Sequence, residues 1–110
     1  MAEREFELEI STLAQKLASI KSVLNFSTMA AEITRLEEEA ANPNLWDDPE
    51  SATATTSRLS RLQGEVAHFN KLESRLNDLP ILIELAQSEN DASSLKDAEA
   101  ELDSLTRAIE

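Results

Sequence analysis

The stretch NPNLWDDPE, residues 42–50, separates two segments whose apolar residues recur at helical spacing. Asp48 can cap a helix, because its carboxylate accepts from the free amides of the first turn. Pro49 suits the first helical position, where no hydrogen bond is lost. Leu45 and Trp46 are apolar residues inside a turn, so we expect them to fold back onto a core. We therefore predict a helix–turn–helix with three structural anchors, Trp46, Asp48 and Pro49, and with the Trp46 ring at least half buried.

Working outward from this turn, four segments carry an apolar stripe with steps of three and four residues, which is typical of helices that pack as coiled coils. In chain order the stripes are Phe6, Ile10, Leu13, Leu17, Ile20 and Leu24; Met29, Ile33, Leu36 and Ala40; Leu59, Leu62, Val66, Phe69, Leu76 and Leu79; and Leu95, Ala98, Leu102, Leu105 and Ile109. We expect Asn25 and Phe26 to interrupt the first helix, and Ser27 or Thr28 to cap the second. No segment alternates as a strand does.

The third helix should run from Pro49 to about residue 87 and then reach a polar turn at residues 88–91. Pro80 lies within it, and an internal proline removes one backbone hydrogen bond and clashes with the preceding turn. We therefore expect a kink or a short break at Pro80. Together the four segments predict an all-α fold, an elongated antiparallel bundle of three to four helices with coiled-coil-like packing.

Composition excludes several classes of protein. The chain has 110 residues, enough for one domain or a fragment of a larger protein. Its single glycine, Gly64, rules out a glycine-rich phosphate loop, and the absence of cysteine rules out disulfides and thiolate chemistry. The net charge of −12 disfavours direct phosphate binding and suits a basic protein partner. We expect a soluble, cytoplasmic protein that neither enters a membrane nor reads nucleic acid directly.

No pattern indicates catalysis, a metal site or a cofactor site. His68 is the only histidine, and no nucleophile is spaced to meet it. Asp47, Asp48 and Glu50 match no calcium-binding loop, and capping accounts for them better. We therefore predict a protein that is not an enzyme.

A basic cluster on the third helix is less ordinary, because the chain as a whole is strongly acidic. It comprises Arg58, Arg61, His68, Lys71 and Arg75. Residues 61, 68 and 75 are seven apart, so they recur on one face of the helix. The cluster is either a docking surface or a set of cations that pair with carboxylates of the same or neighbouring helices.

Residues 36–52, LEEEAANPNLWDDPESA, resemble the N-terminal domain of bacterial peptide chain release factor 2, which has a Leu-Glu-rich helix, a Pro-Asx turn, an apolar-Trp pair and an acidic pair before Pro-Glu. Further matches follow in order, at residues 59–62, 79–86, 88–91 and 98–102, so the resemblance covers about residues 16–109. Release factor 1 is similar in architecture but usually lacks the tryptophan. Pro80 departs from the family pattern.

The resemblance implies translation termination at UGA and UAA codons. Members of the family read the codon with a Ser-Pro-Phe motif and trigger hydrolysis with a Gly-Gly-Gln motif, and neither motif occurs here. Residues 1–110 would then be a single N-terminal helical domain of a larger release factor. The resemblance places this domain at the base of the large-subunit ribosomal stalk and links it to the class II release-factor GTPase.

Two rival functions fit the same periodicity. A free-standing acidic adaptor or coiled-coil scaffold is consistent with the stripes and the charge. An all-helical enzyme of the chorismate-mutase type would need Arg and Lys side chains directed into a pocket, for which the basic cluster is the only support.

Overall fold

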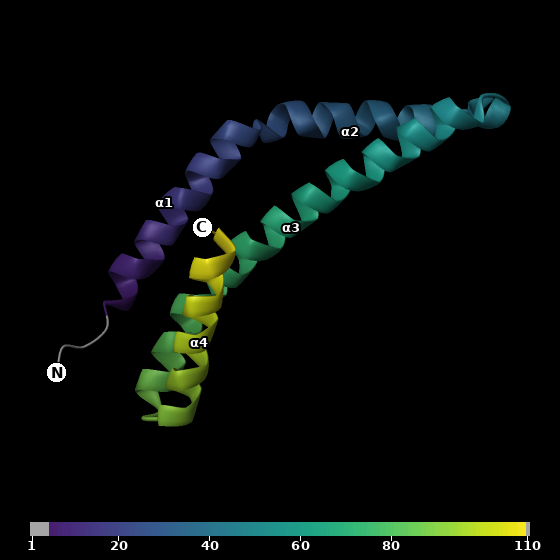
Figure 1. The fold of residues 1–110 in the computed structure, drawn as a ribbon. Helices are drawn as coiled ribbons and strands as arrows, with labels where there is room; N and C mark the ends of the chain where they lie inside the picture. The colour runs from purple at the N-terminus through teal and green to yellow at the C-terminus, as the bar shows by residue number, and fades with distance from the viewer. Residues whose placement is uncertain (1–4, 110) are drawn as a thin grey trace. The chain divides into compact units, whose positions relative to one another are not determined.

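A computed structural model describes residues 5–109, and helices are the only regular secondary structure among them (Figure 1). These are α1 (Phe6–Leu24), α2 (Phe26–Ala40), the short 3-10 helix η1 (Leu45–Asp47), α3 (Pro49–Ser88) and α4 (Ala92–Ile109). No strand is present within the described range. The all-α prediction is confirmed.

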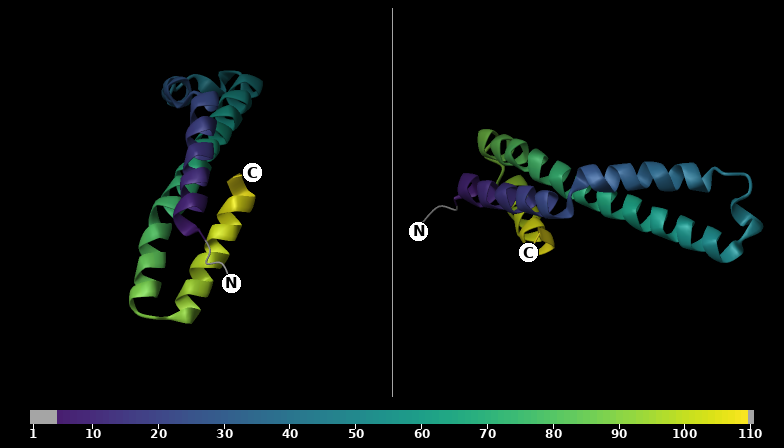
Figure 2. Two further views of the ribbon diagram at one scale, coloured as in Figure 1. Left: turned by 90° about the vertical axis from the view of Figure 1, so that its left-hand side faces the viewer. Right: turned by 90° about the horizontal axis from the view of Figure 1, so that it is seen from above.

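The chain divides into two compact units, and α3 contributes to both. Unit 2 is Lys21–Phe69 and holds α2 and the first half of α3, which run antiparallel to each other (Figure 2). Its buried residues include Met29, Leu36 and Leu62, with half-buried apolar side chains packed against them. The Phe26 and Phe69 rings meet edge to face with centroids 4.7 Å apart, a geometry that aromatic pairs favour.

Unit 1 comprises the described residues up to Ile20 and from Asn70 onward. The second half of α3 and α4 form an antiparallel hairpin (Figure 2), and the start of α1 lies along residues 80–87 of α3. The core of this unit consists of Leu13, Leu17, Leu72, Leu76, Leu79, Ile83, Ala86, Ala98, Leu102, Leu105 and Ile109. Eight of these residues belong to the predicted stripes, because a step of three or four residues keeps side chains on one helical face. Leu72, Ile83 and Ala86 of α3 are buried in addition to them.

The junction between α1 and α2 is shorter than expected. Asn25 alone interrupts the helices, in the left-handed conformation with φ 53°, and no side chain caps α2. Phe26 already belongs to α2, so the prediction of a cap at Ser27 or Thr28 is wrong. Asparagine enters the left-handed region more easily than most residues, so one residue is sufficient to redirect the chain.

Helix α3 has 40 residues and runs through Pro80 without a break. Of the expected kink or short break, the break is absent. Pro80 cannot donate to the carbonyl of Leu76, but Leu76, Leu79 and Ile83 are buried in the core of unit 1 on both sides of it. Their packing offsets the missing hydrogen bond.

The hairpin between α3 and α4 is closed by polar residues. Asn90 is left-handed with φ 53°, and the amides of Asn90 and Asp91 donate to the carbonyls of Gln87 and Ala86. This is a Schellman ending of α3. The Asp91 carboxylate then accepts from the hydroxyl of Ser94 at 2.8 Å and from the amides of Ser93 and Ser94, both at 3.1 Å. These hydrogen bonds begin α4 and lower the pKa of Asp91, the Ser94 hydroxyl contributing most.

Candidate functional site

The turn between α2 and α3 is built by short-range hydrogen bonds. The Asn42 side chain accepts from the amide of Asn44 at 2.9 Å, and η1 follows directly. Asp48 is extended, with φ −122° and ψ 95°, and its carboxylate accepts from the amide of Ser51 at 3.4 Å. Pro49 is the first residue of α3. Asp48 therefore occupies the N-cap position of α3.

Trp46 does not anchor this turn, because 62% of its surface is exposed. The prediction that the ring is at least half buried is wrong. In a 3-10 helix successive side chains point about 120° apart, so neighbours such as Leu45 and Trp46 cannot share a face. Leu45 is half buried and Ala52 is fully buried, so these smaller residues supply the apolar contact at this end of unit 2.

Asp47, Asp48 and Glu50, the acidic residues next to Trp46 in the sequence, are exposed as well. An exposed tryptophan in an acidic surrounding suits a cationic partner, since the ring face attracts Lys and Arg side chains. Tryptophan is also enriched among the residues that dominate protein–protein affinity. The turn is therefore a candidate protein-docking surface.

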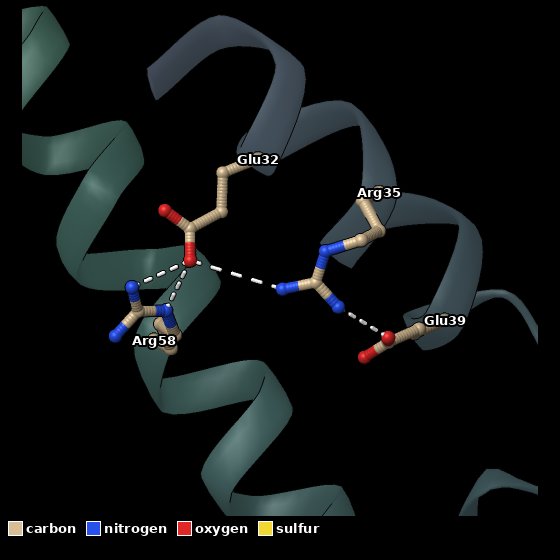
Figure 3. A network of polar contacts seen from close by, with 4 residues as sticks. All are labelled: Glu32, Arg35, Glu39 and Arg58. Carbon is tan, nitrogen blue, oxygen red and sulfur yellow. Dashed lines mark hydrogen bonds and ion pairs between the residues drawn. The ribbon is translucent and has the colours of Figure 1, made fainter. Parts of the chain in front are cut away.

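Arg58 of the basic cluster is engaged within unit 2 (Figure 3). Its guanidinium holds one oxygen of Glu32 on α2, with Nε to Oε1 at 2.6 Å and a second contact from Nη2. Arg35 approaches the same oxygen at 3.8 Å and pairs with Glu39 one turn further along α2. This network ties α2 to α3, so intramolecular pairing accounts for Arg58.

Arg75 is engaged in the same way within unit 1. Its guanidinium donates to Glu101 and, at 3.3 Å, to the hydroxyl of Ser104, both on α4. The hydrogen bond lowers the pKa of Glu101 and raises that of Arg75, because each charge stabilises the other. Intramolecular pairing therefore accounts for Arg75 as well.

The other three members of the predicted cluster are exposed: Arg61, His68 and Lys71. None of the three has a side-chain hydrogen bond or ion pair with another residue of the described range. Arg61 and His68 belong to unit 2, and Lys71 belongs to unit 1. In unit 2, Arg61 and His68 are seven residues apart on α3 and free to meet a partner.

Sequence reasoning missed one cluster on α2, in which Glu32 binds both Arg58 and Arg35, and Arg35 also pairs with Glu39. The spacing of three and four residues between them was a readable signal for pairing along one helix. Only the proximity of α2 to α3 shows that Arg58 joins them.

Within residues 5–109, no group of three or more His, Asp or Glu side chains is arranged to hold a metal ion. None of the described helices has an apolar stretch of the length that a bilayer core requires.

Comparisons with known proteins give the family. Residues 29–110 match the model of the PCRF domain. The chain is 44% identical over 109 residues to peptide chain release factor 2 of Arthrobacter sp. (strain FB24), and 45% identical over 105 residues to that of Kineococcus radiotolerans. These alignments cover 99% and 96% of the chain. With the Streptomyces avermitilis protein of the same name, the identity is 41% over all 110 residues.

The chain spans 29–30% of the length of these relatives. The family model covers three-quarters of the chain, including the turn with Trp46, all of α3 and the described part of α4. On this match, the chain belongs to the PCRF domain family.

Proposed function

We propose that this chain is the N-terminal helical module of a UGA- and UAA-specific peptide chain release factor and acts in translation termination in the cytoplasm. The observation that carries the proposal is the identity of 41–45% along nearly the whole chain with relatives named peptide chain release factor 2. An adaptor or scaffold protein would share the helical periodicity but would not need this identity.

Within such a factor, the module does not read the codon or trigger hydrolysis. The chain has a single glycine, Gly64, and no serine precedes a proline, so it holds neither a Gly-Gly-Gln nor a Ser-Pro-Phe motif. The 110-residue chain, added alone to ribosomes halted at a stop codon, should release no peptide. Codon-dependent release above a buffer control would overturn the proposal that this module takes no part in codon reading or hydrolysis.

The role that remains is contact with the ribosome at the base of the large-subunit stalk and response to the class II release-factor GTPase. In unit 2 the exposed side chains best suited to such contact are Trp46 at the turn, and Arg61 and His68 on α3. Trp46 offers an apolar ring, and the two α3 side chains have no partner among the described residues. The net charge of −12 favours basic ribosomal proteins as neighbours of the module.

Charge reversal tests the docking surface. In a release factor that carries this chain as its N-terminal region, Arg61→Glu should slow association with ribosomes, more at low salt than at high salt, because surface charges act mainly on the association rate. Arg107→Glu on α4 is the matched control, since it makes the same charge change at another exposed site. Stop-codon preference should not change. Equal effects of the two reversals at every salt concentration would reject Arg61 as a contact.

A further inference from the structure

The end of α3 carries an unusual amount of exposed apolar surface. Ile81, Leu82 and Leu85 are 58%, 46% and 54% exposed, and spacings of three and four residues put them on one side of the helix. They belong to unit 1, where Leu79 and Ile83 of the same helix already fill the core. The three side chains are therefore surplus to the packing of this unit, and adjacent large apolar residues left exposed commonly mark a binding site.

An open groove adjoins these residues. Its volume is about 460 Å³, and Leu82, Leu85 and Ala86 of α3 face Ala98 of α4 across it. The remaining lining residues are polar or acidic: Glu89, Ser94, Asp97 and Glu101. The groove thus has an apolar floor and a rim of carboxylates.

The charges on the rim are not all neutralised. Glu101 is held by Arg75, as described above. Glu89 and Asp97 are exposed, and their carboxylates have no ion pair within the described part of the chain. Two unpaired negative charges beside an apolar floor favour an occupant that combines apolar side chains with Lys or Arg.

The shape of the groove favours a helix. It lies between two antiparallel helices, and a third helix packs into such a groove through the ridges of its own side chains. The α3 lining spans residues 82–89, about two helical turns. We propose that the α3/α4 groove of unit 1 binds a partner helix that inserts an apolar stripe between Leu82, Leu85 and Ala98 and sets flanking Lys or Arg side chains against Glu89 and Asp97.

The probe for this proposal is a synthetic helical peptide of about 14 residues, roughly four turns, with Leu on one face and Lys on the other. Titration into the 110-residue chain, followed by amide chemical shifts, should perturb residues around 81–101 first. A second peptide with Glu in place of every Lys should bind at least about tenfold more weakly, because the rim repels it.

Substitutions distinguish binding in the groove from general electrostatic attraction of a cationic peptide to an acidic chain. Leu82→Ser with Leu85→Ser should weaken binding at least about tenfold, because the apolar contact is lost. Val23→Ser, at a residue 84% exposed on α1, is the matched control and should leave binding unchanged. Since both leucines are about half exposed and lie outside the buried core, circular dichroism of the double variant should show unchanged helix content.

A second pair of substitutions tests the carboxylates of Glu89 and Asp97. Glu89→Gln with Asp97→Asn should weaken binding and reduce its salt dependence, whereas Glu37→Gln with Glu38→Gln on α2 makes the same charge change and should have less effect. Equal effects of the two pairs, or equal binding of the Lys and Glu peptides, would overturn the proposal. Self-association of the chain would also overturn the proposal if Leu82→Ser with Leu85→Ser abolished it, because the groove would then bind a second copy of the chain.

Discussion

Gly64→Ala should stabilise the protein, although glycine usually has a conformational reason for its place in a fold. Gly64 lies inside α3, it is exposed, and its φ is not in the left-handed region. A Cβ built at this position meets nothing within 4 Å. Neither backbone geometry nor packing therefore requires glycine here.

The size of the expected gain in stability follows from these observations. Alanine is favoured over glycine in a helix interior by about 1 kcal/mol, chiefly because glycine loses more conformational freedom on folding. No steric term offsets this gain, so the free energy of unfolding should rise by about 1 kcal/mol. For a chain of this size, the urea midpoint should rise by about 0.5 M without a change in slope.

Urea denaturation followed by circular dichroism measures the effect directly. Gln63→Ala is the matched control, since it changes the neighbouring exposed residue and should shift the free energy of unfolding by only a few tenths of a kcal/mol. Unchanged or lower stability of Gly64→Ala would refute the reasoning, because it would mean that residue 64 is not in a helix interior or that its Cβ is obstructed.

Four further substitutions test the core and the ion pair of unit 1 and the turn between α2 and α3. Leu102→Ala should lower the free energy of unfolding by about 3 kcal/mol, because this residue is fully buried. Leu82→Ala is its control: at a side chain 46% exposed, it should lower the free energy of unfolding by less than about 1 kcal/mol in the same urea titration. Trp46→Ala should also cost under about 1 kcal/mol, and acrylamide should quench the fluorescence of this single tryptophan readily; a protected indole would contradict the exposed ring. Glu101→Gln should cost roughly 0.5–1 kcal/mol at neutral pH, as a partly exposed ion pair does. Since its pKa is lowered in the folded state, the contribution of Glu101 is present above the ordinary glutamate pKa and is lost as pH falls below it, so the difference from the unsubstituted chain should vanish in strong acid. A difference independent of pH would argue against the ion pair with Arg75.

Helix periodicity was predictable from the sequence because it is a local property. Leu13 and Leu17 on α1, and Leu102 and Leu105 on α4, are buried as their spacing predicts. The N-terminus of α3 was readable for the same reason, since Asp48 and Pro49 act on amides within one turn of themselves.

Features that depend on distant parts of the chain were not predictable. Burial of Trp46 would need an element to cover the ring, and a local pattern cannot say whether one is present. The partners of Arg58 and Arg75 depend on which helices lie side by side, as Glu32 and Glu101 are each 26 residues away. Continuity of α3 through Pro80 also reflects tertiary packing, which here outweighs a local helix-breaking signal.

The most direct test of the central claim, that this chain is the N-terminal module of a release factor, is an exchange of modules. The chain would replace the homologous region of the Arthrobacter release factor 2, with which it is 44% identical. The rate of peptide release at a UGA codon would be measured with and without the class II GTPase. We predict a rate and a GTPase response close to those of the unaltered factor, and a clear loss of both when an unrelated acidic helical bundle occupies the same place. Equal impairment by this chain and by the unrelated bundle would contradict the account.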